Sequence, residues 1–178
     1  MPHLQPQRPA PIPEGHPLRQ LFQAMTEASF EQVGTRDVEL MIYVTGLLID
    51  FVHMDNLYRV RDAQGRRLEY LFDLQVESQQ GDAAHARATQ KHLGDYALFI
   101  VGMFPESLQR HRRPVSPDYY IWQGKSAYAT VSEMDGLKPT AALFRKLASQ
   151  FEICVQALQI EKAFMQDRFY QYLMRQLA

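Results

Sequence analysis

The sequence has a single cysteine, Cys154, among its 178 residues. One thiol cannot form an intramolecular disulfide, and the paired-cysteine spacings of zinc ribbons and thioredoxin-like redox sites are absent. We therefore expect a reducing compartment, the cytoplasm of a bacterial-type cell. Cys154 itself continues an apolar helical stripe and has no Lys, Arg or His three or four residues away to stabilise a thiolate, so we interpret it as an inert core residue.

Long apolar runs and an excess of one charge are also missing. The longest apolar stretch, residues 38–52, is interrupted by Glu39, Thr45 and Asp50, and prolines occupy the N-terminal region where a secretory signal needs a continuous apolar segment. There are 19 basic and 20 acidic residues, which gives a net charge of −1. We expect neither a membrane nor a nucleic-acid partner, because both kinds of binding depend on clustered Lys and Arg.

The familiar catalytic signatures are absent as well. The sequence holds no Gly-x-Ser-x-Gly elbow and no His-Glu-x-x-His helix. Gly124-Lys125-Ser126 resembles the end of a phosphate loop, but Tyr119 stands where that motif has its first glycine, and the segment lies inside a predicted helix. We therefore interpret Lys125 as a cation on a helix surface and Tyr128 as a packed aromatic residue.

Apolar residues recur at helical spacing along most of the chain, whereas strand-type alternation is not sustained. We predict an all-α, single-domain bundle of six to seven helices over residues 17–178. The expected helices cover about residues 18–33, 36–54, 68–80, 82–103, 116–135 and 139–160, and a segment at about 165–177 either continues the sixth helix or folds back.

Capping residues and glycines indicate the helix boundaries. Thr35 is expected to cap the second helix, and Ser116-Pro117-Asp118 is typical of a helix start. Gly34, Gly81 and Gly136 are placed to end helices.

Two predicted helices have unusual composition. The second carries apolar residues around much of its circumference, which predicts a central, heavily buried helix. The fourth contains Gly94 and Gly102, each of which costs about 1 kcal/mol relative to Ala, so we expect close packing against a neighbouring backbone there.

Residues 1–16 form a proline-rich N-terminal arm. Proline lacks a backbone donor and imposes extended or polyproline II geometry, so we predict a disordered, solvated arm whose removal changes stability little. The alternative is that residues 9–13 bind an aromatic groove as a proline-rich ligand.

Four stretches support a resemblance to other proteins: residues 52–59 (VHMDNLYR), 91–106 (KHLGDY to FPE), 123–128 (QGKSAY) and 143–147 (LFRKL). Together they resemble a family of uncharacterised bacterial all-helical proteins, over roughly residues 35–160. The resemblance implies a bacterial helical domain and supplies no catalytic residues.

The sharpest candidate site combines Asp50-x-x-His53 on the second helix with His92-x-x-Asp95 on the fourth. A three-residue spacing places both members of each pair near one helix face, so two antiparallel helices could surround a divalent metal with four ligands. The alternative is that His53 and His92 are buried core histidines whose rings are satisfied by hydrogen bonds.

A second candidate is the basic cluster of Arg110, Arg112 and Arg113, close before a predicted helix start. Such a cluster could bind a phosphate or carboxylate. The alternative is a solvated charged loop.

The leading hypothesis is a non-enzymatic binding or interaction module, for a protein partner or a small apolar ligand held between helices. It is favoured by the lack of a catalytic motif and by ten Phe, nine Tyr and eight Met, although these residues can also simply fill the core. We expect no cofactor. The rival hypothesis is a metal-dependent enzyme that uses Asp50, His53, His92 and Asp95.

The last segment has more apolar faces than one packing contact covers, so we predict either a homodimer through the C-terminal helix or a helix that closes the bundle. In the homodimer hypothesis Phe169, Tyr172 and Leu173 pack on the domain, and Met165 and Tyr170 meet a second copy.

Overall fold

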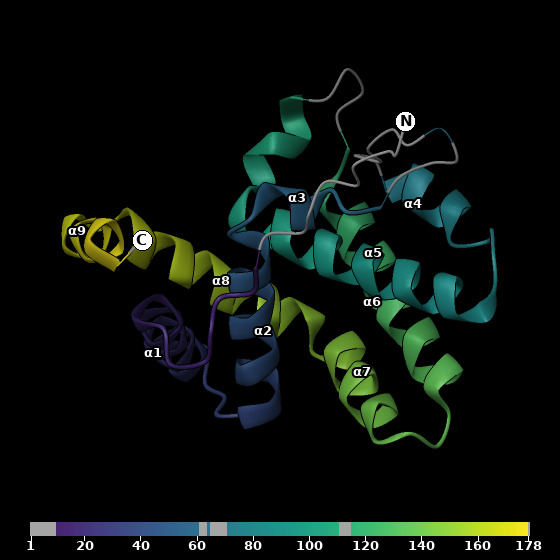
Figure 1. Ribbon diagram of the computed structural model, residues 1–178, viewed down its shortest axis with the longest axis horizontal. Helices are drawn as coiled ribbons and strands as arrows, with labels where there is room; N and C mark the ends of the chain where they lie inside the picture. Colours follow the sequence, from purple (N-terminus) through teal and green to yellow (C-terminus); the bar gives the residue numbers. More distant parts are fainter. Residues whose placement is uncertain (1–9, 61–63, 65–70, 111–114, 178) are drawn as a thin grey trace.

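The computed structural model describes residues 10–60, 64, 71–110 and 115–177 and, within these ranges, every side chain except those of Met54 and Tyr170. All regular structure in this part of the chain is helical, which confirms the all-α prediction (Figure 1). No helix there combines the length and the apolarity that crossing a bilayer requires. In chain order the helices are α1 (Pro17–Gln32), α2 (Val38–Phe51), α3 (Met54–Leu57), α4 (Leu71–Glu77), α5 (Ala83–Met103), the 3-10 helix η1 (Pro105–Arg110), α6 (Pro117–Asp135), α7 (Pro139–Ser149), α8 (Phe151–Gln166) and α9 (Arg168–Leu177).

Side-chain caps determine where several helices begin. Ser116 caps α6 as predicted, and Asp82 caps α5. For α2 the cap is Asp37 rather than Thr35: its carboxylate accepts a hydrogen bond from the backbone N–H three residues further on, at 3.2 Å. The same carboxylate pairs with Lys146 of α7 at 3.0 Å, so a tertiary contact favours the later start.

Glycines terminate the helices as the sequence indicates. Gly34, Gly81 and Gly136 have φ angles of 84°, 77° and 57°, in the left-handed region that residues with a side chain avoid. Gly34 follows the end of α1, and Gly136 follows α6 directly.

The predicted sixth helix is two helices, α7 and α8, separated at Gln150. This residue has φ −112° and ψ 24°, outside the helical region. Buried residues continue at helical spacing across the break, from Leu147 to Phe151 and Cys154. The apolar stripe therefore gives no sign of the interruption. The split, together with the short helices α3 and η1, explains why the described part of the chain has more helices than predicted.

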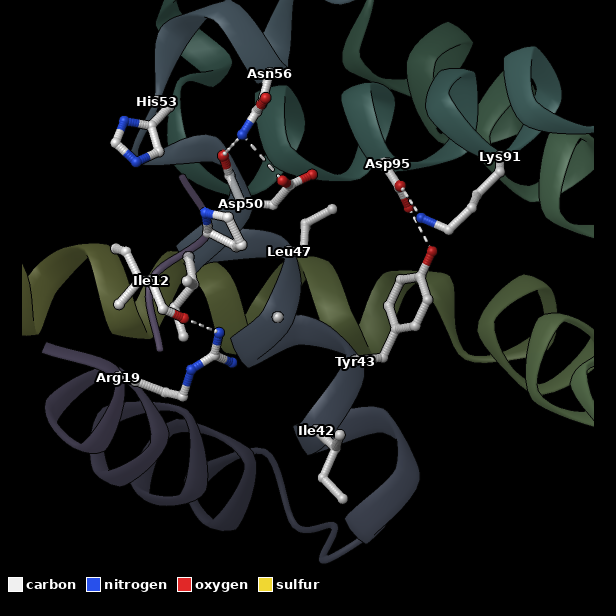
Figure 2. Close-up of a pocket in the computed structure, with 13 residues that line it drawn as sticks. Ile12, Arg19, Ile42, Tyr43, Leu47, Asp50, His53, Asn56, Lys91 and Asp95 are labelled. Atoms are coloured by element: carbon white, nitrogen blue, oxygen red, sulfur yellow. Dashed lines mark hydrogen bonds and ion pairs between the residues drawn. The ribbon is translucent and has the colours of Figure 1, made fainter. Parts of the chain in front are cut away.

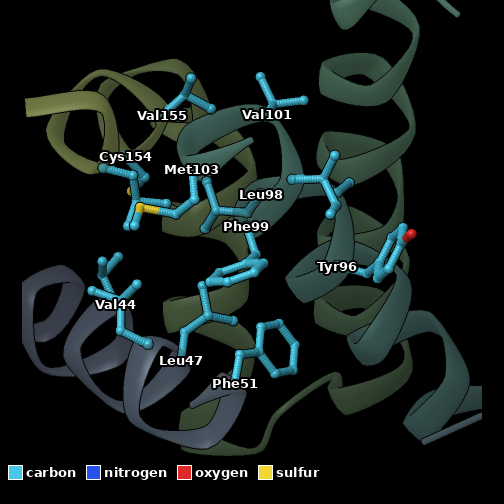
Figure 3. Close-up of a cluster of buried hydrophobic side chains, with 14 of the residues drawn as sticks. Val44, Leu47, Phe51, Tyr96, Leu98, Phe99, Val101, Met103, Cys154 and Val155 are labelled. Carbon is cyan, nitrogen blue, oxygen red and sulfur yellow. The ribbon is translucent and has the colours of Figure 1, made fainter. Parts of the chain in front are cut away.

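The centre of the bundle is α5, not α2. Every residue from His92 to Met103 is buried, and α5 packs against α2, α4, α6 and α8. The second helix is buried or half-buried from Val44 to Phe51, as predicted, but Val38 and Ile42 in its first half are exposed, and it is not the central helix. Figure 3 shows Val44 of α2 in the same apolar cluster as Met103 of α5 and as α8 residues.

Three helical glycines allow this close packing. A Cβ atom on Gly94 would lie 2.6 Å from the ring of Tyr128, one on Gly102 would lie 2.5 Å from Leu158, and one on Gly124 would lie 2.4 Å from Phe151. The expected close approach at Gly94 and Gly102 is confirmed. The neighbours that occupy the space are side chains of α6 and α8 rather than backbone.

The N-terminal segment from residue 10 lies against the domain. Ile12 packs on the core, and the guanidinium of Arg19 on α1 donates to the carbonyls of Ile12 (2.8 Å) and Pro13 (3.3 Å). The described part of the arm is thus attached to α1 through Arg19, but Ala10, Pro11 and Pro13 stay exposed at the surface. Residues 1–9 of the predicted arm lie outside the described residues.

The last helix presents a different face from the one predicted. α9 lies beyond the end of α8 and next to α1 (Figure 1). Phe169 is 62% exposed and Tyr172 is 60% exposed, so these two do not pack on the domain, whereas Leu173 is half-buried. Met165, predicted at a dimer surface, packs against the core, and the side chain of Tyr170 is outside the described set. The extended backbone of the residue between α8 and α9 turns the last helix relative to α8.

One carboxyl group is buried between α1 and α8. Glu161 is fully buried, and both of its oxygens lie within 3.1 Å of Thr26 Oγ1, which donates its single proton to them. Burial raises the pKa of Glu161 to about 8. The side chain is therefore a neutral acid in the folded chain at neutral pH.

We predict that Gly124→Ala destabilises the fold. The new methyl group would press on the buried ring of Phe151, and overpacking of this kind costs about 1–3 kcal/mol against a helix-propensity gain of about 1 kcal/mol. The expected net loss in the free energy of unfolding is therefore up to about 2 kcal/mol, measured by urea denaturation. Gly46→Ala in α2 is the matched control, because a Cβ there meets no atom within 4 Å, and it should be stabilising.

A second prediction concerns the pH dependence of stability. The folded chain keeps the Glu161 proton until about pH 8, whereas an unfolded chain releases it near its ordinary pKa of 4.5. The stability that depends on this proton is complete below the unfolded pKa and is lost as pH rises through the folded one, by about 1.4 kcal/mol per pH unit at most. Glu161→Gln should gain stability relative to the natural chain as pH rises from about 5 to about 8. Parallel urea midpoints for both proteins across that range would contradict the assignment.

Candidate functional site

A buried carboxylate, that of Asp95 on α5, connects three helices through its hydrogen bonds. The hydroxyl of Tyr43 on α2 donates to it at 2.5 Å, and that of Tyr128 on α6 donates at 2.8 Å. Lys91, one turn earlier on α5, pairs with the other carboxylate oxygen at 2.6 Å. Burying a charge is costly unless it is paired and hydrogen-bonded, and here both oxygens have partners.

The two tyrosines stay protonated donors. Burial, together with the negative charge of Asp95, raises the pKa of Tyr43 and of Tyr128 well above the ordinary value for a phenol. The ammonium of Lys91 lies 5.3 Å from the centre of the Tyr43 ring, which adds a cation–π contact. The arrangement therefore holds α2, α5 and α6 in a defined register and leaves Lys91 half-exposed.

A pocket of about 370 Å³ opens between α2, α5 and the segment around Ile12 (Figure 2). This volume is in the range of natural small-molecule sites. The lining is a mixture of aliphatic and polar residues: Pro11, Ile12, Arg19, Ile42, Tyr43, Gly46, Leu47, Ile49, Asp50, His53, Asn56, Lys91 and Asp95. One wall is thus the N-terminal segment, and the others are helices.

Gly46, in the middle of α2, leaves space beside the helix backbone where it lines the pocket. The glycines at 94, 102 and 124 each have a neighbour that fills the space of their missing side chain, but a Cβ on Gly46 would meet no heavy atom within 4 Å. Glycine in a helix interior costs about 1 kcal/mol relative to alanine. At Gly46 this cost is not repaid by any packing within the described structure, and the free space belongs to the pocket.

A second polar group lies where α2 ends. The side-chain amide of Asn56 donates to the carboxylate (3.0 Å) and to the backbone carbonyl (2.9 Å) of Asp50, and Arg59 pairs with the other carboxylate oxygen. His53 is half-buried in the lining, and its side chain makes no hydrogen bond to a described residue. Figure 2 shows Asp50, His53 and Asn56 together at one end of the pocket and Tyr43, Lys91 and Asp95 at another.

The predicted metal ligands are not assembled into one site. Asp50, His53 and Asp95 line the pocket, but Asp95 is enclosed by its three donors and Asp50 is paired with Arg59. Across the described ranges, no group of three or more His, Cys, Asp or Glu side chains is placed to hold a metal ion.

His92 is directed into the core instead of the pocket. Its ring makes an edge contact with Phe51, at 6.1 Å between centroids, and lies beside Tyr96. The prediction that His92 is buried is confirmed, but neither ring nitrogen has a hydrogen-bond partner in the described structure. Burial lowers the pKa of His92 to about 4, so the ring is neutral.

The other sequence candidates are placed as follows. Arg110 is exposed at the end of η1, and Arg112 and Arg113 lie outside the described residues, so that anion cluster stays a prediction. Lys125 forms a surface ion pair with Glu152 at 2.7 Å. Cys154 is buried, and burial raises the pKa of its thiol to about 12, in agreement with an inert core cysteine.

Sequence reasoning missed several residues that shape the pocket. Lys91 was missed although it lies four residues before Asp95, a spacing that predicts an ion pair on one helix face. Gly46 lies in the middle of a mostly apolar predicted helix, a position where glycine is unfavourable. No sequence pattern indicated that Arg19 and Ile12 line the pocket, because their positions depend on how the N-terminal segment crosses α1 and α2.

Comparisons of the chain with protein-family models, with curated proteins and with solved structures found no match. Function is therefore inferred from the side chains themselves.

We predict that Tyr128→Phe destabilises the fold by about 1.5–3 kcal/mol, since the lost hydroxyl is a buried donor to a charged carboxylate. Urea denaturation measures the effect. Tyr119→Phe is the matched control: Tyr119 is exposed and its hydroxyl contacts only a surface glutamine, so its change should stay within about 0.5 kcal/mol. Equal effects of the two variants would show that the Asp95 network does not hold the helices together.

Proposed function

We propose that this chain is a non-enzymatic binding protein that holds a small molecule in the pocket over Gly46. The observation that carries the proposal is the unfilled space at this glycine. Where a sequence accepts a local cost without a packing gain, a functional site is the expected reason. A glycine also permits a ligand to approach the helix backbone closely.

The lining supports a ligand with both apolar and polar parts. Ile12, Ile42 and Leu47 offer aliphatic surface, while polar groups of α2 and α5 lie at two ends. Apolar surface combined with polar groups at fixed positions is typical of sites that orient one small molecule. The proposal thus retains the apolar ligand expected from the sequence and adds a polar end to it.

The alternative, a metal-dependent enzyme, has less support from the geometry. Both oxygens of Asp95 already accept hydrogen bonds from Tyr43, Tyr128 and Lys91, so this carboxylate is poorly placed to act as a base or a ligand. His92 lies away from the pocket lining. A pocket whose carboxylates are already paired is better suited to binding than to proton transfer.

The test fills the pocket from inside. Gly46→Leu projects a side chain into the free space, and Gly46→Ala is the smaller control. The probes are octanoate, 1-octanol and octylamine, each titrated into ¹⁵N-labelled protein while the amide shifts of residues 42–50 are followed. We expect at least one probe to bind the natural chain and the Gly46→Leu variant to lose that binding while remaining folded. If none of the three shifts these amides, or if Gly46→Leu binds equally well, the proposal is wrong.

A further inference from the structure

Some of the charged side chains around the pocket have a partner of opposite charge, and one does not. Two carboxylates face it, those of Asp50 and Asp95, and each is already paired with a cation: Asp50 with Arg59, and Asp95 with Lys91. Each carboxylate also accepts hydrogen bonds from neutral donors: Asp50 from the amide of Asn56, and Asp95 from two tyrosine hydroxyls. Neither carboxylate therefore needs a positively charged ligand.

Arg19 is the cation in the lining that has no such partner. Its guanidinium is half-buried and donates to the carbonyls of Ile12 and Pro13, which are neutral acceptors. Within the described structure no carboxylate lies in ion-pair distance of it, and its Nη1 makes no hydrogen bond. The two carbonyl contacts fix the plane of the guanidinium, so the group is held in place before any ligand arrives.

Further donors face the same space. Lys91 uses one of its three N–H groups on Asp95 and remains half-exposed in the lining. The His53 imidazole, also in the lining, has no hydrogen-bond partner among the described residues. The neutral imidazole also has one acceptor nitrogen, and Asn56 has its side-chain oxygen, so the imbalance in this set is one of charge: a guanidinium that has no carboxylate.

An anionic group is the complement of this arrangement. A carboxylate would neutralise the unmatched charge of Arg19 and accept from a planar donor in the geometry that guanidinium groups favour. An amine would have to compete with Arg59 or Lys91 for a carboxylate that is already paired, and a neutral alcohol would leave Arg19 unmatched.

We infer that the ligand is a small aliphatic carboxylate, whose carboxylate is bound by Arg19 and whose hydrocarbon part lies over Gly46 against Ile42 and Leu47. This inference rests on the proposed function and adds the chemical class of the ligand. Figure 2 shows Arg19 beneath Ile12 on the side of α2 that also carries Ile42.

The test compares three probes that share one hydrocarbon chain. Binding of octanoate, 1-octanol and octylamine to the natural chain is measured by isothermal titration calorimetry. We expect octanoate to bind most tightly, and Arg19→Gln to weaken octanoate by about tenfold or more while changing 1-octanol by less than about twofold. Arg36→Gln is the matched control, since Arg36 is an exposed arginine paired with Glu31 and outside the pocket lining.

Retained binding of 1-octanol by Arg19→Gln shows that the pocket survives the substitution. Arg19→Lys keeps the charge but not the planar fork, so it should weaken octanoate less than Arg19→Gln does. If octanoate binds no more tightly than 1-octanol, or if Arg19→Gln weakens both equally, the carboxylate inference is wrong even though the pocket binds. If Gly46→Leu leaves every probe unaffected, the proposed function itself fails.

Discussion

The fold depends on one buried negative charge, that of Asp95. A carboxylate inside a bundle is tolerated only with a complete set of partners, and these come from three helices: Tyr43 of α2, Lys91 of α5 and Tyr128 of α6. Removing any one partner leaves the charge partly unmatched, so the three helices are held together more specifically than apolar packing alone would hold them. The same network forms one wall of the pocket, and the position of the candidate site therefore follows from the way this charge is satisfied.

Glycine determines where the bundle is tight and where it is open. At Gly94, Gly102 and Gly124 a large side chain from a neighbouring helix occupies the space of the missing Cβ, which lets α5, α6 and α8 approach closely. At Gly46 no neighbour does so. Glycine thus has two roles in this domain. Gly94, Gly102 and Gly124 allow neighbouring helices to pack closely, whereas Gly46 leaves open the part of the pocket that lies beside the polar groups of α2 and α5.

Local sequence signals located most of the helix ends but not the layout of the bundle. Ser116 and the glycines at 34 and 136 act within one or two turns of their own position, so the sequence alone predicts them. The break at Gln150 and the burial of α5 on all sides depend on neighbours distant in the chain. An apolar stripe reports which face of a helix can be buried, and it cannot report whether the polar face, as around Asp95, is buried too.

By itself the sequence determined the all-α class, the positions of the principal helices, the inert character of Cys154 and the polar spacing that placed Asp50, His53 and Asp95 near one region. Only the tertiary structure decided that His92 points into the core, that Asp95 is enclosed by two tyrosines, and that Arg19 holds the segment at Ile12 beside an open space at Gly46. The physical reason is that a helical pattern specifies spacing along one element. The direction in which a side chain points, and the partner that satisfies it, are set by how separate elements cross.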